Sequence, residues 1–172
     1  MERKIVTVFG SSLPKPGDLE YETAFELGKQ LALNGFDVCS GGFQGIMDAV
    51  SKGATSEKGK AIGITVDLFD AEPSKYLTTE IKCNTLFERI DKLITSGDAY
   101  IVLPGGTGTL VELSLVWEMM NKNMISNRPI ICYGEMWKSI VNAMEERTKL
   151  EGRKTGLVKC VESVQECLNI LK

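Results

Sequence analysis

Histidine is absent from all 172 residues of the chain. Without imidazole the protein has no Ser-His or Cys-His nucleophile pair and no histidine-based zinc site. Any chemistry must come from carboxylates, arginine, lysine, hydroxyls, thiols and backbone groups. We therefore expect a site that works without a metal and without another cofactor.

The chain also lacks an excess of positive charge and a long hydrophobic run. Its 20 lysines and arginines are outnumbered by 23 acidic residues, so a nucleic acid polymer is not an expected partner. No apolar run has the length of a membrane span, and Glu2-Arg3-Lys4 leads directly into a strand pattern, which argues against a membrane partner and a signal peptide. The five cysteines form no C-x-x-C pair, which favours reduced thiols and a cytoplasmic location.

Short apolar segments alternate with segments of helical periodicity along the whole chain. The expected strands are residues 4–9, 36–39, 61–66, 99–103, 129–133 and 157–161. The expected helices are residues 19–34, 45–57, 85–95, 109–122 and 136–149, with a last helix after a capping box at Ser163 and Glu166.

This alternation predicts an α/β, Rossmann-like fold with a predominantly parallel sheet and helices on both faces. The length suits one core, so we expect residues 1–172 to form a single nucleotide-binding domain. Residues 67–80 contain Pro73 and few core signals, and we interpret them as a surface loop near the site.

The strand at 99–103 is followed by a stretch that is unusually rich in glycine. Pro104 ends the strand because it has no N–H for the ladder. The predicted phosphate cradle then consists of Gly105, Gly106, Thr107, Gly108 and Thr109. Such a turn into a helix start gathers free N–H groups at the positive end of the helix dipole, which suits phosphate. The alternative is an ordinary strand–helix turn.

Two other polar, glycine-containing turns follow predicted strands. The first contains Ser11 and Ser12, and the second contains Gly41 and Gly42. Because the carboxyl ends of parallel strands meet at one edge, we expect all three turns to converge there, with these four residues contacting base or ribose. Any one turn could simply be a tight connection. Met47, just beyond the second turn, is expected to fill core or interface space.

The segment Pro104-Gly-Gly-Thr-Gly-Thr-x-x-Glu112 resembles the PGGxGTxxE signature of the LOG family of cytokinin-activating phosphoribohydrolases, which were long mislabelled as lysine decarboxylases. Phe9-Gly-Ser-Ser12 and Gly41-Gly-x-x-Gly-Ile-Met47 extend the resemblance over nearly the whole chain. It implies a Rossmann-like fold, homodimers, and hydrolysis of the N-glycosidic bond of a nucleoside 5′-monophosphate to a free base and ribose 5-phosphate.

The chain departs from the family at two pairs of residues. An Arg-Lys pair of the family is Arg89-Ile90 here, and a Met-His pair just before it is Leu86-Phe87. The lost lysine favours an alternative in which the protein is a non-hydrolysing nucleotide or molybdenum-cofactor carrier on the same fold. An NAD-dependent oxidoreductase is a weaker reading because no turn has the full G-x-G-x-x-G fingerprint.

Glu112 is the candidate for the chemistry. Glycosidic cleavage passes through a cation-like state, so a carboxylate near the sugar can stabilise that state or activate water. The competing interpretation is structural, because Thr109-x-x-Glu112 is also a capping-box sequence.

Arg89 is the second candidate catalytic residue, as the group that would orient the phosphoribosyl moiety. On the same helix Glu88 and Lys92 can pair at i,i+4, whereas Arg89 has no acidic residue three or four positions away. A guanidinium can bind phosphate or sugar oxygens in a fork. The alternative is a solvated helix charge.

The helix at 109–122 is apolar on more than one side. One face can cover the sheet, and the rest must be buried elsewhere. A helix shared between two subunits would bury it, which fits the family's dimer, although neighbouring helices of the same chain could also cover it.

Overall fold

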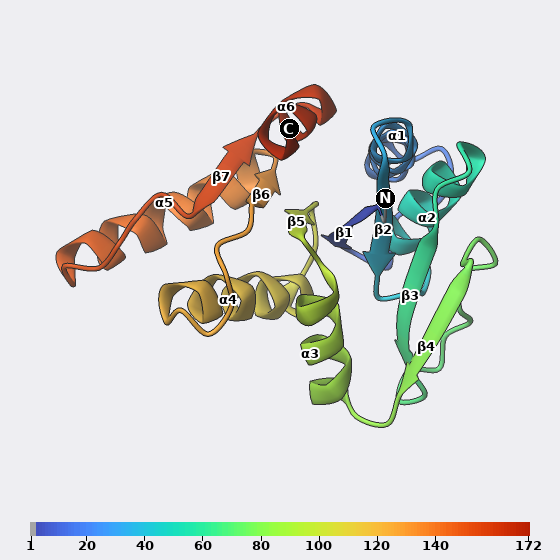
Figure 1. Ribbon diagram of the computed structural model, residues 1–172, viewed down its shortest axis with the longest axis horizontal. Helices are drawn as coiled ribbons and strands as arrows, with labels where there is room; N and C mark the ends of the chain where they lie inside the picture. The colour runs from blue at the N-terminus through green and yellow to red at the C-terminus, as the bar shows by residue number, and fades with distance from the viewer. Residues whose placement is uncertain (1–2) are drawn as a thin grey trace.

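The computed structural model describes residues 3–172, which form seven strands and six helices in that range (Figure 1). The strands are β1 (Lys4–Phe9), β2 (Phe36–Ser40), β3 (Ala61–Val66), β4 (Thr79–Cys83), β5 (Ala99–Val102), β6 (Ile130–Tyr133) and β7 (Val158–Val161). The helices are α1 (Leu19–Leu33), α2 (Ile46–Ser56), α3 (Leu86–Ser96), α4 (Thr107–Asn121), α5 (Glu135–Leu150) and α6 (Val164–Leu171).

All seven strands of the described residues belong to one sheet in the order β4-β3-β2-β1-β5-β6-β7, and every pairing is parallel. The chain builds one half of the sheet outward from β1 to β4. It then returns to place β5 on the other side of β1. This reversal between β1 and β5 is the switch point at which open α/β sheets form their ligand crevice.

Two layers of helices cover the sheet (Figure 1). Val6 and Val8 of β1 pack with residues of α1, α2 and α6, whereas Phe9 packs with residues of α3, α4 and α5. Because both faces are buried, the central strands are mostly apolar on both faces, and every residue of β5 is buried. The predicted α/β, Rossmann-like fold with helices on both faces is confirmed.

The prediction for residues 67–80 is wrong at its end. Residues 67–78 connect β3 to β4, but Thr79 and Glu80 already belong to β4. This edge strand pairs only with β3, and Thr79, Glu80 and Lys82 are exposed. An edge strand with a polar surface lacks the apolar run by which the central strands are recognised.

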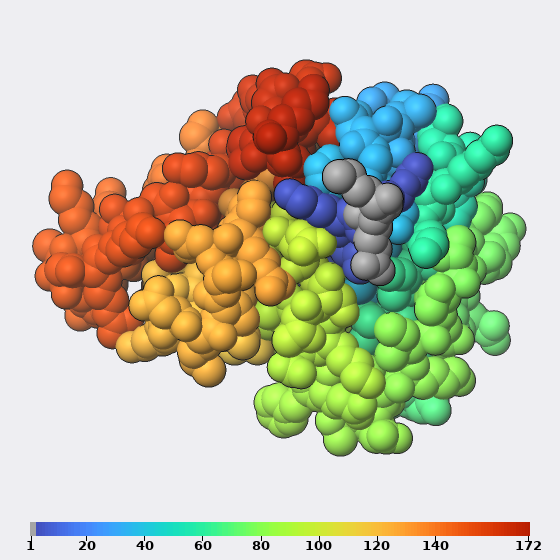
Figure 2. All heavy atoms as spheres, viewed as in Figure 1, coloured from blue at the N-terminus to red at the C-terminus, as the bar shows by residue number. Residues whose placement is uncertain are grey.

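The C-terminal part of the chain follows the sequence prediction more closely. The hydroxyl of Ser163 accepts a hydrogen bond from the backbone N–H of Glu166 at 3.2 Å, as the predicted capping box requires. The far end of α5 projects beyond the sheet, and in the space-filling view it forms the protruding orange end of the molecule (Figure 2).

No helix in residues 3–172 is long and apolar enough to cross a membrane.

Helices α1 and α2 approach each other at two glycines. A Cβ atom at Gly28 would lie 2.1 Å from the carbonyl oxygen of Val50, and one at Gly53 would lie 2.0 Å from that of Phe25. These backbone–backbone contacts leave no space for a methyl group.

We expect Gly28→Ala to lower the free energy of unfolding by about 3 kcal/mol, because the added methyl must push the two helices apart. Gly108→Ala is the matched control, since a Cβ atom at Gly108 meets no other atom within 4 Å. Its effect should be smaller than about 1 kcal/mol. Chemical denaturation measures both values. Equal stability of Gly28→Ala and the wild type would contradict the close helix contact.

Candidate functional site

The turns after β1, β2 and β5 meet at the backbone of Ser11. The N–H of Ser11 donates to the carbonyl of Pro104 at 3.0 Å, and its carbonyl accepts from the N–H of Ile46 at 2.9 Å. Gly45 lies directly beneath this turn with φ of 68°, and a Cβ atom there would lie 2.4 Å from the carbonyl oxygen of Ser11. The convergence expected from the parallel sheet is therefore present, and it requires glycine at position 45.

A cleft of about 530 Å³ opens at this meeting point. Most of the predicted site residues line it: Ser11, Ser12, Arg89, Gly106, Thr107, Gly108, Thr109 and Glu112. The remaining three, Gly105, Gly41 and Gly42, are not among its lining residues. The cleft is therefore formed by the turns after β1 and β2, the 67–78 loop, the start of α4 and one side chain from α3.

Helix α4 begins at Thr107, with Gly106 as its N-cap and no side-chain cap. The expected helix start at residue 109 is therefore two residues too late, and Thr109 lies inside the first turn instead of at the N-cap. The Thr109 side chain is buried. Its hydroxyl oxygen would lie only 2.2 Å from a Cβ atom at position 105, so Gly105 leaves the room that this side chain needs. The N–H groups of the first turn have no intrahelical acceptor and lie at the positive end of the helix dipole.

This helix start also removes the structural interpretation of Glu112. Glu112 lies in the second turn of α4, well beyond the N-cap, so it does not form a capping box with Thr109. Glu112 lines the cleft instead.

Burial raises the pKa of Glu112 from 4.5 to about 7, and the positive charge of Arg89 partly opposes that rise. The two side chains interact through their charges without a direct ion pair between them among the described contacts. A carboxyl whose pKa is raised toward neutrality is suited to exchanging protons or, once ionised, to stabilising a cation.

Arg89 is only 6% exposed, so the interpretation as a solvated helix charge is wrong. Its Nε donates to the carbonyl of Ile64 at 2.8 Å, and its Nη2 donates to the carbonyl of Gly41 at 3.1 Å. The predicted pair on the same helix does form, with Lys92 Nζ 2.9 Å from Glu88 Oε1. Burial lowers the pKa of Arg89, and the carboxylate of Glu112 opposes that change.

Gly41 and Gly42 lie behind the cleft wall. A Cβ atom at Gly41 would lie 1.9 Å from Nη2 of Arg89, so this glycine makes room for the guanidinium. Gly42 has φ of 77°, and its carbonyl accepts a hydrogen bond from the N–H of Ser74 at 2.8 Å. The structure thus places these two glycines around Arg89 and the 67–78 loop rather than at the cleft surface.

One wall of the cleft is apolar and was not predicted from the sequence. Phe43 and Phe69 meet edge to face, with ring centroids 5.7 Å apart, and both rings lie within 5.6 Å of the guanidinium carbon of Arg89. Leu13 and Met47 also line the cleft, so Met47 is both largely buried and part of the site. Phe43 could have been suspected from its place in a glycine turn, whereas no sequence signal marks Phe69.

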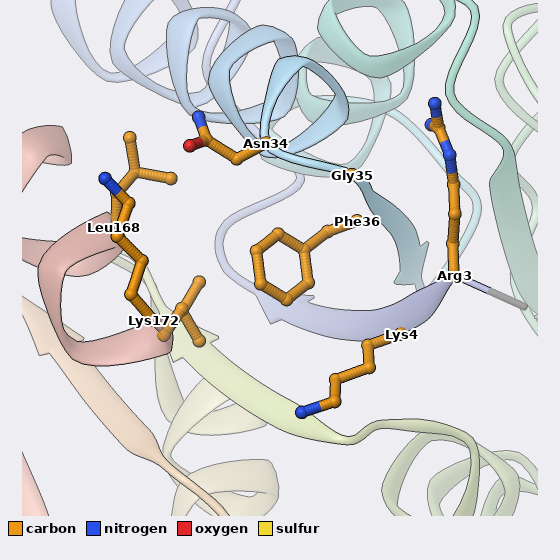
Figure 3. Close-up of a pocket in the computed structure, with 8 residues that line it drawn as sticks. Arg3, Lys4, Asn34, Gly35, Phe36, Leu168 and Lys172 are labelled. Carbon is orange, nitrogen blue, oxygen red and sulfur yellow. The ribbon is translucent and has the colours of Figure 1, made fainter. Parts of the chain in front are cut away.

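Another hollow, of about 490 Å³, lies at the opposite end of the sheet (Figure 3). It is formed by Arg3 and Lys4 at the start of β1, by Phe36 at the start of β2, and by the end of α6. Because ligands of open α/β sheets bind at the carboxyl ends of the strands, this hollow is not the candidate site.

Within residues 3–172 no group of histidine, cysteine or acidic side chains could hold a metal ion.

The strand order and the position of the cleft define a Rossmann-like protein with its candidate site at the β1–β5 switch point. Residues 3–166 match the SLOG cluster4 family, and the chain belongs to that family. The predicted resemblance to the LOG family is confirmed by the curated relatives.

One relative, the cytokinin riboside 5′-monophosphate phosphoribohydrolase of Mycobacterium marinum, is 33% identical over 122 residues, which cover 67% of this chain and 63% of the relative. The enzyme of the same name from Rhodococcoides fascians is 28% identical over 134 residues, covering 74% and 66%. The chain thus spans about half to two thirds of the length of the curated relatives it matches.

Among solved structures, the molybdenum cofactor binding protein of Rippkaea orientalis superposes with a TM-score of 0.77 at 24% identity. The superposition covers 98% of this chain and 95% of that protein. This similarity establishes the common fold.

The raised pKa of Glu112 makes the stability of the protein depend on pH. The folded state holds the Glu112 proton more tightly than the unfolded state, in which the pKa is near 4.5. This contribution is fully present below that value and is lost as pH rises through about 7. We expect Glu112→Gln to gain stability relative to the wild type, on the order of 2 kcal/mol, between about pH 5 and pH 8.

Denaturant titrations across this pH range test the prediction. Glu118→Gln is the matched control on the exposed side of the same helix, and it should not change the pH profile. Parallel profiles for the wild type and Glu112→Gln would show that the carboxyl of Glu112 titrates as it does in the unfolded chain.

Proposed function

We propose that this protein hydrolyses the N-glycosidic bond of a nucleoside 5′-monophosphate to a free base and ribose 5-phosphate. Water adds across the bond: its hydroxyl goes to C1′ of the ribose and its proton to the base nitrogen. One observation carries the proposal: the start of α4, which has no side-chain cap, and Glu112 line the same cleft.

The start of α4 would bind the 5′-phosphate. The free N–H groups of its first turn, the exposed Thr107 hydroxyl and the helix dipole favour an anion at this point. Gly106 and Gly108 carry no side chain, so the phosphate can approach the backbone closely. Ser11 and Ser12 supply further hydroxyls on the facing turn.

The apolar wall of Phe43, Phe69, Met47 and Leu13 would hold the base. A planar base stacks on aromatic rings and is desolvated there. The Phe69 ring belongs to the 67–78 loop, which supports the expectation that this loop lies near the site.

Glu112 would act on the sugar between these two ends of the ligand. Its carboxylate form stabilises the positive charge that develops on the ribose, or it takes a proton from the attacking water. Arg89 favours that ionised form electrostatically. Since two of its donors are occupied by the Gly41 and Ile64 carbonyls, it would orient the phosphoribosyl group only with the N–H groups that remain.

The curated relatives, whose names state phosphoribohydrolase activity on cytokinin riboside 5′-monophosphate, support this reaction class. A second candidate function is that of a non-hydrolysing nucleotide or molybdenum-cofactor carrier. It is favoured by Ile90, which stands where the LOG family has lysine and packs in the core against α4 and the sheet. The molybdenum cofactor binding protein with the same fold is consistent with this alternative.

We further infer that the protein forms a homodimer through α4. Leu113, Val116 and Trp117 bury one side of this helix, but Val111 and Leu115 remain 50% and 40% exposed one turn apart. A second copy would cover these two side chains. Light scattering at micromolar concentration should give the mass of two chains, and a single-chain mass would contradict the inference.

We also infer that residues 1–172 act as one nucleotide-binding domain in the cytoplasm. The single sheet in the described residues supports one domain. All five cysteines lie in the described part of the chain and are free thiols, which fits a reducing compartment.

Incubation with AMP tests the reaction. The wild type should release adenine, and Glu112→Gln should release it at least about 100-fold more slowly while AMP still binds, because the carboxylate acts mainly on the transition state. Glu118→Gln should behave as the wild type. Adenine release is followed by chromatography and AMP binding by calorimetry.

Near-normal turnover of Glu112→Gln would remove Glu112 from the mechanism. Tight binding of AMP by the wild type without any adenine release would instead support the carrier function.

A further inference from the structure

A second cleft, of about 560 Å³, lies beside the proposed nucleotide cleft. The two clefts share only Ser12 and Leu13, which form the wall between them. The second cleft is bounded by the 14–16 segment, by α1 and α2, and by residues 73–76 of the loop before β4. Neither Arg89 nor Glu112 lines it.

Positive charge is concentrated in this second cleft. Lys15, Lys52 and Lys75 line it, and none of these three forms a salt bridge with any described carboxylate. The Lys52 ammonium lies 5.8 Å from the centroid of the Tyr76 ring, and the Lys75 ammonium lies 5.2 Å from it. An aromatic ring attracts a cation but does not neutralise it. Two like charges therefore share one ring in a chain whose net charge is −3.

Among the described residues that line the cleft, Asp48 is the one with a carboxylate, and it does not balance the three lysines. Asp48 is 9% exposed, and its oxygens accept hydrogen bonds from the Tyr21 hydroxyl at 2.5 Å and from the Ser74 hydroxyl at 2.7 Å. The Asp48 carboxylate is thus hydrogen-bonded to two neutral hydroxyl groups and not to a lysine. Burial and the hydrogen bond to Asp48 raise the pKa of Tyr21, so that hydroxyl stays protonated.

The same hydrogen bonds fix the walls of the cleft. Asp48 ties α2 to Tyr21 of α1 and to Ser74 of the loop. The N–H of Ser74 also donates to the carbonyl of Gly42, and the Ser74 hydroxyl accepts from the N–H of Tyr76 at 3.2 Å. Lys75 and Tyr76 are consequently presented by an anchored segment, which lowers the entropy lost when they bind a ligand.

We propose that this second cleft binds a phosphoryl group other than the 5′-phosphate of the nucleotide. Ammonium groups bind phosphate as compact point charges, and an anion placed among Lys15, Lys52 and Lys75 relieves their mutual repulsion. The phosphoryl group belongs either to a separate phosphorylated small molecule or to a distal phosphate of an extended nucleotide that crosses the Ser12–Leu13 wall. The proposal does not depend on hydrolysis at Glu112.

Calorimetric titration of the full chain with inorganic pyrophosphate at low salt tests this site. We expect the double variant Lys52→Met, Lys75→Met to bind pyrophosphate at least about tenfold more weakly than the wild type, since two charged contacts are lost. The control Lys149→Met, Lys154→Met removes the same charge at exposed lysines outside the cleft, and it should stay within about twofold. Lys52→Arg, Lys75→Arg keeps the charge and should retain binding.

Equal weakening in the cleft variant and in the matched control would show binding by diffuse charge and would overturn the proposal. It would also fail if pyrophosphate bound the cleft variant as tightly as the wild type, because the anion would then occupy another place such as the start of α4. Thermal unfolding of each variant verifies that it is folded.

A second arm separates the two sources of the phosphoryl group. It compares the binding of AMP and ADP to Glu112→Gln with and without Lys52→Met, Lys75→Met. Weaker binding of ADP in the lysine variant, with AMP binding unchanged, indicates one ligand spanning both clefts. Unchanged binding of ADP, with pyrophosphate binding still dependent on the lysines, indicates a separate molecule. Adenine release by the wild type is measured separately, so failure of either proposal is visible without the other.

Discussion

The site depends on one buried positive charge, the guanidinium of Arg89. Removing a charge from water is costly, and here two carbonyl groups and a nearby carboxyl offset that cost. The carbonyls come from Gly41 after β2 and from Ile64 in β3, so the side chain joins the carboxyl ends of two strands to α3. Because Gly41 leaves room for the guanidinium, Arg89 can lie under the turns instead of in solvent. The Glu112 carboxyl then faces a fixed positive field.

The sheet topology supplies the rest of the site. The reversal between β1 and β5 separates the helices that would otherwise cover both turns, and the Ser11 backbone connects the turn after β1 to Pro104 and to the start of α2. The uncapped start of α4 is thereby exposed beside Glu112. A helix start with free N–H groups, an apolar wall and a carboxyl with a raised pKa thus occur in one cleft, because three parallel strands end at the same edge.

Much of this arrangement could be predicted from the sequence. Apolar periodicity identified six of the strands, and the glycine-rich turns after them predicted their convergence, since parallel strands have one carboxyl edge. Arg89 stood out because it had no acidic partner on its own helix, yet its acceptors lie 25 and 48 residues away and no local pattern identifies them. The polar edge strand β4 had no apolar signal, and Phe69 reaches the cleft only because the loop that carries it folds back. The start of α4 was misplaced because a glycine N-cap leaves no side-chain signature of the kind that threonine suggested.

The central claim is that the free N–H groups at the start of α4 hold the phosphate of a nucleotide whose ribose faces Glu112. A crystal structure of Glu112→Gln soaked with AMP tests it most directly. The account predicts the 5′-phosphate within hydrogen-bond distance of the backbone N–H groups of residues 107–109, with C1′ of the ribose beside residue 112 and the base against Phe43 and Phe69. An unoccupied cleft, or AMP bound with its ribose turned away from residue 112, would contradict it.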